Sequence, residues 1–346
     1  MSGPSLKFIF TFNMVMQFIG HLFLPFQRKQ QKVKMENQTS ATEFLLLGLS
    51  SSSKVQLLLF GLFTVIYTLA LVGNTIILVL TWLDSQLRTP MYFFLRHLSL
   101  VDICYISSTV PQMLANLLNP KRIISFAGCG VQTYLFLALG ITECVLLAVM
   151  AYDRYIAICH PLSYTLIMDH IFCIGLAATA WMCGFLLATI HTVQTLQMPF
   201  CGPNAINHFY CDILALLKLV CADTHMNEIT VFVIGILILL CPFCLILISY
   251  IQILVAISRI HSAVGRLKAF ATCASHLTTV LLFYGSAMFM YMRPGSSHSP
   301  DQDKMISLFY SVITPLFNPI IYSLRNKEVK GAIVKVMQRT TVFLGR

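Results

Sequence analysis

Charged residues are scarce in this chain of 346 residues. They make up 10% of it, whereas 57% of its residues are hydrophobic and its mean hydropathy is +0.79. Ordinary soluble domains carry roughly 25% charged residues. The composition therefore excludes a water-soluble surface, and with it a disordered protein, a nucleic-acid-binding protein and a small secreted protein held by disulfides. The net charge of +10 can be interpreted only once its place along the chain is known.

Seven stretches of the chain are strongly apolar and almost free of charge. Each is longer than the ~18 residues that can span a bilayer as a helix, and only Asp102 and Glu143 carry a charge within them. The stretches are Leu57–Leu83, the segment between Arg96 and Lys121, Cys129–Tyr152, Ile171–Ile190, Ile229–Ser258, Ala269–Met292 and Met305–Leu324. The sequence therefore predicts an all-α membrane protein, a bundle of seven transmembrane helices.

The positive charges predict how this bundle is oriented. From Met35 onward, 12 of the 18 Lys and Arg residues fall on one side of the predicted membrane and 6 on the other. Because cytoplasmic loops carry the excess of positive charge, we expect the C-terminus inside the cell and the N-terminal segment outside. Asn37 begins the triplet Asn-Gln-Thr on the expected outer side, where it is a predicted N-glycosylation site.

The first 34 residues do not fit a standard targeting segment. Leu6–Phe26 is apolar but interrupted by polar residues, and four basic residues follow it. A signal peptide has its positive charge before the apolar core, and an eighth span would place these basic residues on the outer side. We expect an extension that adds no functional element, with translation starting at Met35.

Four of the twelve cysteines lie on the expected outer side, namely Cys129, Cys201, Cys211 and Cys221. An oxidising exterior favours disulfides between them, and four cysteines allow three pairings, which the spacing alone leaves open. We interpret the other eight as buried apolar thiols.

Two carboxylates, Asp102 and Glu143, lie within the predicted membrane. Asp102 is 12 residues after Pro90 and Glu143 is 11 residues before Arg154, which places both about 16–18 Å from the inner face. Two ionised carboxylates in hydrocarbon are costly without partners. Three interpretations remain open: a small cation such as sodium, held with help from Asn318; a proton shared by the pair; and catalysis of the kind seen in aspartyl intramembrane proteases.

Short motifs occur in a fixed order along the predicted spans. They are Gly73-Asn74, Pro90–Leu95, Leu98–Asp102, Met150–Cys159 with its Asp153-Arg154-Tyr155 triplet, Trp181, Ser249-Tyr250, Lys268–Leu277 and Pro315–Asn326. This series resembles the rhodopsin-like (class A) G-protein-coupled receptors and, within them, the olfactory (odorant) receptors. The resemblance covers Met35 to about Arg339.

The resemblance implies a function. An olfactory receptor is a multi-pass plasma-membrane protein that binds a small, largely apolar volatile ligand in the outer half of its bundle. It activates a heterotrimeric G protein of the stimulatory class, which raises cyclic AMP. It is not an enzyme and needs no cofactor, apart from the sodium ion considered above.

The resemblance also implies roles for individual residues. Arg154 is the expected activation switch, restrained at rest by Asp153 and followed by Tyr155, with Tyr250 and Tyr322 as its partners on opening. Asn318 and Pro319 match the hinge in the seventh span, and Asp102 and Glu143 match the cation-site pair. The implied disulfides are Cys129–Cys211 and Cys201–Cys221.

The implied ligand pocket is apolar and aromatic, with a few polar groups. A retinal Schiff base lacks an anchor because Met305–Leu324 contains no lysine, and a protonated amine lacks its usual partner because Cys129–Gly140 contains no aspartate. Tyr291 is the best hydrogen-bond donor among the expected pocket residues, each of which is equally consistent with ordinary bundle packing. These residues are Phe136, Leu137, Gly140, Ile141, Ile234, Ile238, Met288 and Tyr291.

The predicted organisation has four parts: an atypical extension over 1–34, an extracellular segment over 35–56, a receptor domain over 57–325 and a cytoplasmic tail over 326–346. Within the tail, the pattern of Asn326–Arg339 predicts an amphipathic helix on the lipid surface. Other functions stay open. They are a receptor of the same family for a metabolite in another tissue, a membrane enzyme, and a transporter or channel, although the sequence shows no internal repeat.

Overall fold

The structure of the protein, a computed structural model, describes residues 42–201, 204–259, 261–293 and 299–324, together with Val329 and Gly331. All of these belong to the compact unit formed by residues 41–346. Three predictions lie outside the described residues: the extension over 1–34, the glycosylation site at Asn37 and, apart from two residues, the amphipathic helix over 326–339.

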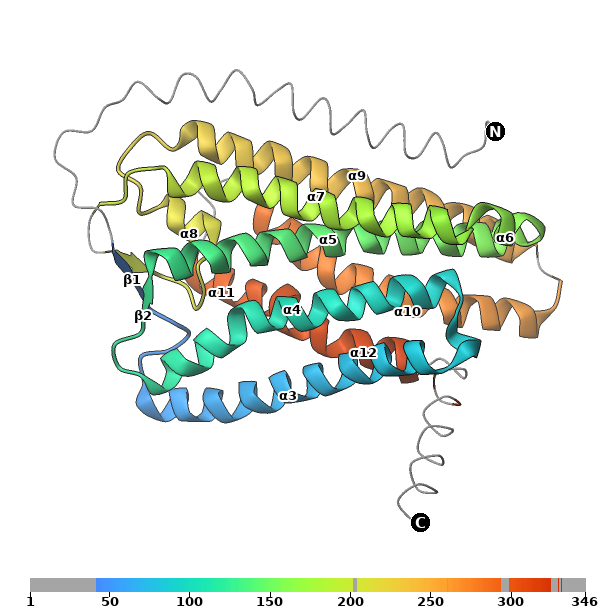
Figure 1. The fold of residues 1–346 in the computed structure, drawn as a ribbon, viewed down its shortest axis with the longest axis horizontal. Coiled ribbons are helices and arrows are strands. Elements are labelled where there is room, and N and C mark those ends of the chain that lie inside the picture. Colours follow the sequence, from blue (N-terminus) through green and yellow to red (C-terminus); the bar gives the residue numbers. More distant parts are fainter. Residues whose placement is uncertain are drawn as a thin grey trace, which may run out of the picture. The chain divides into compact units, whose positions relative to one another are not determined.

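Seven helices in the described part of the chain are long and apolar enough to cross a membrane, which confirms the predicted fold class. The first six are α3 (Ser53–Leu83), α4 (Pro90–Leu118), α5 (Phe126–Cys159), α7 (His170–Leu196), α9 (His225–Ser258) and α10 (Ala263–Tyr291) (Figure 1). The seventh combines α11 (Pro300–Leu308), a π-helical turn (Phe309–Ile313) and α12 (Thr314–Leu324). Short helical segments in the connections are η1 (Ser85–Leu87), η2 (Pro161–Ser163), α6 (Tyr164–Ile167) and α8 (Ile213–Leu217).

Local sequence signals set where several of these helices begin. Ser125 precedes α5 and its Oγ accepts a hydrogen bond from the Gly128 N–H at 3.1 Å. Asp169 caps α7 in the same way, with Oδ1 at 2.7 Å from the Phe172 N–H. Such side chains satisfy N–H groups that have no partner within the helix.

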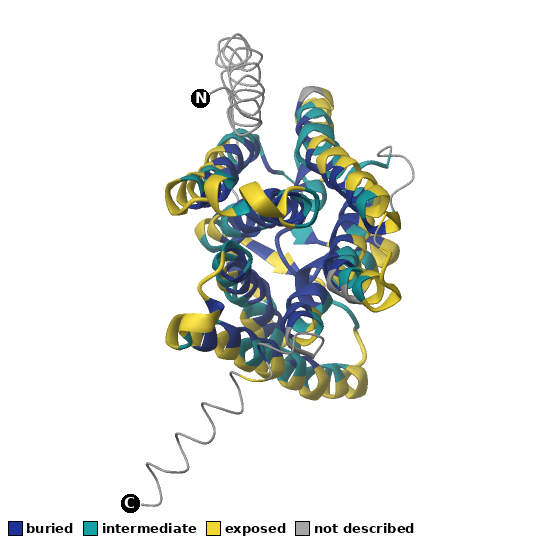
Figure 2. Cartoon of the chain, turned by 90° about the vertical axis from the view of Figure 1, so that its right-hand side faces the viewer, coloured by how far each residue is buried: buried dark blue, intermediate teal, exposed yellow. Residues whose placement is uncertain are grey.

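Helix α5 is the central element of the bundle. It packs against α4, α7 and α9, and 78% of its most apolar window is buried, compared with 11% for α3. In Figure 2 the buried residues face the inside of the bundle and the exposed ones face outward. Because the outward faces of α3 and α9 carry exposed leucine, valine and isoleucine, this surface suits lipid rather than water.

Two glycines allow helices to approach closely. A Cβ at Gly184 on α7 would collide with the Ala138 carbonyl oxygen and the Thr142 Oγ1 on α5. A Cβ at Gly73 on α3 would lie 2.9 Å from Cγ of Pro319 on α12. These contacts place backbone against backbone or proline ring, which a larger side chain would prevent.

A three-stranded sheet and two disulfides close one end of the bundle, called here the disulfide end. The strands β1 (Glu43–Leu46), β2 (Ile123–Ser125) and β3 (Ala205–Ile206) lie in the order β2-β1-β3, with β1 antiparallel to β2 and parallel to β3. The disulfides are Cys129–Cys211 and Cys201–Cys221, with Cα–Cα distances of 5.5 and 5.9 Å, and this is the pairing that the resemblance implied.

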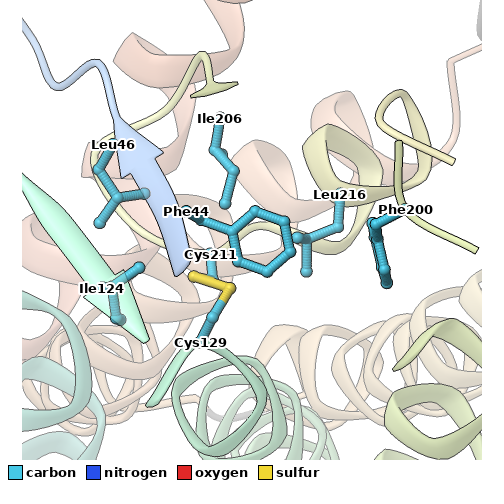
Figure 3. Packing of buried hydrophobic residues seen from close by; sticks show 8 residues of the cluster. All are labelled: Phe44, Leu46, Ile124, Cys129, Phe200, Ile206, Cys211 and Leu216. Atoms are coloured by element: carbon cyan, nitrogen blue, oxygen red, sulfur yellow. A yellow bond between two sulfur atoms is a disulfide. The ribbon is translucent and has the colours of Figure 1, made fainter. Parts of the chain in front are cut away.

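The Cys129–Cys211 disulfide lies within an apolar cluster that fixes the loop between α7 and α9. In Figure 3, Phe44 of β1 extends over the disulfide, with Leu216 of α8 beside it. Thr133 on α5 strengthens the attachment, because its Oγ1 donates to the Cys211 carbonyl at 2.8 Å. Gln132 adds a second bond by accepting from the Cys211 N–H at 2.9 Å. The residues after Cys211 are therefore held over the end of the bundle.

Candidate functional site

A cavity of about 80 Å³ lies inside the bundle, mainly between α5, α9 and α10. On α5 its wall runs from Phe136 to Cys144, which are 7 and 15 residues after Cys129. At a rise of 1.5 Å per residue, the cavity begins about 10 Å from the disulfide and reaches about 22 Å from it. It therefore lies in the half of the bundle nearest the disulfide end.

The cavity wall is almost entirely aliphatic and aromatic. Tyr105 of α4 stacks on Phe136 of α5 with ring centroids 4.8 Å apart, and Ile213 of α8 contributes from the loop. The lining residues are Tyr105, Phe136, Leu137, Gly140, Ile141, Cys144, His191, Ile213, Val231, Ile234, Gly235, Ile238, Leu239, Phe283, Ala287, Tyr291 and Tyr310. Such a wall binds an apolar molecule by excluding water from both surfaces.

Polar atoms gather beside this cavity in a group that we call the tyrosine cluster: Tyr210, Asp212, Tyr291, Ser307 and Tyr310. The Tyr210 and Tyr310 hydroxyls are 3.1 Å apart, and the Ser307 Oγ is 3.0 Å from the Tyr310 hydroxyl. The Tyr210 and Tyr291 hydroxyls each donate to Asp212 Oδ2 at 3.4 Å. Tyr291 and Tyr310 line the cavity, whereas Asp212 lies behind them.

Asp212 is the charged member of the cluster and is 1% exposed. Its Oδ1 accepts the Leu214 and Ala215 N–H groups at 3.0 and 3.2 Å, which makes it the N-cap of α8. Burial raises the pKa of the Asp212 carboxyl, and the two N–H donors oppose this rise by stabilising the carboxylate. Burial, with the Tyr310 and Asp212 oxygens close by, raises the pKa of Tyr210 well above its ordinary value, so this hydroxyl keeps its proton.

His208 lies close to the cluster as a neutral group. Its Nδ1 accepts the Tyr210 N–H at 3.4 Å, so Nε2 carries the ring proton. Burial and the positive charge of Lys304 lower the pKa of His208 to about 3. The cationic form is therefore strongly disfavoured at neutral pH.

The two carboxylates predicted to meet within the membrane are both fully buried, and they interact electrostatically. Asn318 of α12 donates to both oxygens of Asp102 at 3.1 and 3.0 Å. Both oxygens of Glu143, and the side-chain oxygens of Asn74 and Asn318, have no hydrogen-bond partner among the described residues. Buried oxygens of this kind are the ligands that a small hard cation prefers, so the residues fit a sodium ion. This site has only two acidic side chains, and no group of three or more His, Cys, Asp or Glu side chains that could hold a metal ion occurs among the described residues.

Most of the predicted activation residues lie toward the end of the bundle opposite the disulfides: Asp153, Arg154 and Tyr155 near the end of α5, Tyr250 on α9 and Tyr322 on α12. Asn318 and Pro319 lie further inside, beside Asp102 and Gly73 respectively. Arg154 is 5% exposed, and the neighbouring Asp153 accepts a hydrogen bond from the Tyr164 hydroxyl of α6 at 2.8 Å. The Tyr250 hydroxyl on α9 lies 2.8 Å from Nδ1 of His276 on α10. This bond joins the two helices that also line the cavity.

Comparisons with known proteins match almost the whole bundle. The sequence profile of the family described as "Olfactory receptor" matches residues 63–340. The chain belongs to the olfactory receptor family. It is 55% identical to human olfactory receptor 2A5 over 303 residues, which are 87% of this chain and 97% of that receptor. It is 56% identical to human olfactory receptor 2A12 and 52% identical to mouse olfactory receptor 2A7, each over 87% of this chain and 97% of the relative.

Membership of the olfactory receptor family confirms several predictions. This olfactory receptor is a G-protein-coupled receptor of the plasma membrane that crosses the bilayer repeatedly. Its relatives are signalling receptors for small molecules.

The structure places seven of the eight predicted pocket residues of the olfactory receptor in the cavity wall: Phe136, Leu137, Gly140, Ile141, Ile234, Ile238 and Tyr291. Met288 is not in this wall, although Ala287 next to it is. Their part in binding stays a prediction.

Sequence reasoning missed the acidic and phenolic groups beside the cavity. Asp212, Tyr210 and Tyr310 were not among the candidate residues, and neither was His191 of the wall. One signal could have indicated Asp212: it directly follows Cys211, so an attachment of Cys211 to the bundle brings its neighbour with it.

Proposed function

We propose that this olfactory receptor binds a small, largely apolar volatile molecule in the cavity between α5, α9 and α10. Binding activates a heterotrimeric G protein of the stimulatory class and raises cyclic AMP, with the disulfide end outside the cell. The observation that carries the proposal is the cavity itself: an apolar space with a few polar groups in its wall, inside a member of this family.

The lining chemistry supports a neutral ligand. No side chain of the cavity wall is an acid, a lysine or an arginine. A permanently charged ligand would lose its hydration without gaining a partner of opposite charge, which is unfavourable in a low-dielectric site. An uncharged molecule with a single polar group matches the wall better.

Two helices offer a physical route from the cavity to the opposite end. On α10, Tyr291 lines the cavity and His276 lies 15 residues earlier, about 22 Å along the helix. On α9, Ile238 lines the cavity and Tyr250 contacts His276. A ligand that favours one arrangement of α9 and α10 therefore shifts the arrangement that a G protein meets, and the coupling is reciprocal.

A cavity-filling variant tests the ligand site. Gly235 lines the cavity, and the nearest atoms to a Cβ built there are 4.0 Å away. Gly235→Val therefore fits the fold but fills part of the cavity, and we expect it to raise the half-maximal concentration of an activating odorant at least tenfold. Gly175→Val is the matched control, because Gly175 is an exposed helical glycine on α7 with nothing within 4 Å of its Cβ position.

The assay is a cyclic AMP reporter in cells treated with an odorant panel, with surface levels of each variant measured in parallel. Equal responses of Gly235→Val and Gly175→Val, at equal surface levels, would show that the ligand binds elsewhere. A response in calcium or in another G-protein pathway without cyclic AMP would refute the stimulatory coupling and leave the ligand site standing.

We also propose that Asp102, Glu143 and Asn318 hold a sodium ion. The unpartnered oxygens of Glu143 support this proposal, since a buried carboxylate without a partner is strongly unfavourable. Replacing potassium by sodium in the buffer should raise the thermal stability of the purified receptor, and Glu143→Gln should remove this dependence. A stability that follows pH and is indifferent to sodium would point instead to a shared proton.

A further inference from the structure

The hydroxyl protons of the tyrosine cluster have a direction, and Asp212 sets it. An ionised carboxylate only accepts hydrogen bonds, whereas a tyrosine hydroxyl donates one proton and accepts through its oxygen. Asp212 faces four donors, the Leu214 and Ala215 N–H groups at Oδ1 and the Tyr210 and Tyr291 hydroxyls at Oδ2. Four donors on one carboxyl group fit its charged form.

The donation from Tyr210 to Asp212 fixes which hydroxyl is the donor in each further contact of the cluster. Tyr210 gives its proton to Asp212, so its contact with Tyr310 at 3.1 Å requires Tyr310 to be the donor. Tyr310 has then used its proton as well, and its contact with Ser307 at 3.0 Å requires Ser307 to donate. All the protons therefore point toward Asp212, because each hydroxyl has only one to give.

This direction decides what the cavity offers to a ligand. Tyr291 and Tyr310 are the cluster members that line the cavity, and both have given their protons to other residues. Both oxygens can only accept from a ligand, Tyr291 freely and Tyr310 through the lone pair that Ser307 leaves unused. We propose that Asp212 makes the cavity selective for ligands that donate a hydrogen bond, namely neutral alcohols and phenols, over aldehydes, ketones and ethers of the same skeleton.

The ligand class follows from where the charge lies. Asp212 does not line the cavity, so a ligand meets the tyrosine oxygens and not the carboxylate. A protonated amine would lack direct contact with the negative charge and would be buried at a high cost. A neutral hydroxyl loses far less hydration free energy than a protonated amine does, and it gains one hydrogen bond by donating to a tyrosine oxygen.

The inference rests on the proposed function for the location of the ligand, and its experiment separates the two. The probes are C6–C10 alcohols, each with the aldehyde or ketone and the methyl ether of the same skeleton, and alkylphenols, each with its methyl ether. Two readouts are used on the full-length receptor: the cyclic AMP response in cells, and the shift in melting temperature of the purified protein. The second readout needs no G protein.

We expect the hydroxyl compounds to act at about tenfold lower concentrations than their carbonyl and ether analogues, which is the effect of one neutral hydrogen bond. Asp212→Asn should abolish this preference or favour the carbonyl compounds, because the asparagine amide donates and leaves the tyrosine protons free for the ligand. Asparagine is also a good N-cap, so α8 keeps its start.

Two further variants secure the interpretation. Asp223→Asn is the matched control, since Asp223 is an exposed loop residue whose Oδ1 accepts the His225 N–H at 3.0 Å, and it should leave the preference unchanged. Tyr291→Phe removes one acceptor from the wall while keeping Asp212, and should reduce the preference even if Asp212→Asn does not reach the surface.

The outcomes distinguish the two proposals. A preference for hydroxyl compounds in the melting shift without any cyclic AMP response would support this inference and refute the stimulatory coupling. Cyclic AMP responses in which carbonyl compounds match their alcohols would overturn the inference and leave the proposed function intact. A panel in which no alcohol or phenol acts in either readout would also overturn it.

Discussion

Replacing Gly184 by alanine should force α5 and α7 apart. A Cβ at this position would collide with the Ala138 carbonyl oxygen and with the Thr142 Oγ1. Thr142 cannot turn away without loss, because its Oγ1 donates to the same carbonyl at 2.7 Å. Overpacking of this kind costs about 1–3 kcal/mol, and a rigid backbone oxygen places the site at the upper end. Alanine's better helix propensity offsets about 1 kcal/mol, which leaves a net loss of about 2 kcal/mol.

Gly175 on the same helix supplies the control. It is exposed, and nothing lies within 4 Å of a Cβ there, so Gly175→Ala keeps only the propensity gain of up to about 1 kcal/mol. At about 2–4 °C per kcal/mol, the melting temperature of the purified receptor should fall by about 4–8 °C for Gly184→Ala and rise slightly for Gly175→Ala. If both variants melt at the same temperature, the close packing of α5 and α7 is wrong.

Three further predictions concern the loop and the activation switch. Cys211→Ser should lower the melting temperature more than Cys221→Ser, because the bridges close loops of 82 and 20 residues, worth at most about 4.5 and 3 kcal/mol in chain entropy. The pKa of His208 is about 3 in the folded state and 6.5 in the unfolded state, so the unfolded state binds the proton first as the pH falls. The free energy of unfolding therefore falls below pH 6.5 by about 1.4 kcal/mol per pH unit. His208→Asn should make the melting temperature less dependent on pH between pH 6.5 and 5. Arg154→Ala should signal less than the parent receptor at equal surface level in the cyclic AMP assay, and an equal response would refute the switch role.

The helices could be predicted from the sequence because a membrane imposes a simple rule. A spanning helix must satisfy its backbone internally and present apolar side chains to lipid, and both demands appear as long stretches without charge. The ends of the helices were harder to predict. Helix α3 begins at Ser53, before Lys54, because a long charged side chain at a helix end can reach water while its backbone stays helical.

Of the eight pocket positions inferred from the family resemblance, seven lie in the cavity wall and Met288 does not. Phe283, Ala287 and Tyr291 line the cavity at a spacing of four residues, which puts them on one face of α10. Met288 follows Ala287 directly, about 100° further round the helix, and this rotation takes its side chain away from the wall. The helical phase of α10, rather than residue type, separates Met288 from its neighbours.

The sequence indicates only that Asp212 follows a cysteine expected to be attached to the bundle. Its place behind Tyr291 depends on contacts between residues far apart in the chain. The third span has no acidic residue in Cys129–Gly140, which predicts that the ligand has no charged partner there. That conclusion holds for direct contact, since no carboxylate lines the cavity. The disulfide between Cys129 and Cys211 nevertheless brings Asp212 behind Tyr291, where it acts on the hydroxyl proton instead of on the ligand. An acid one residue layer behind a wall changes which neutral ligand the wall accepts, and it does so without making the wall attractive to cations.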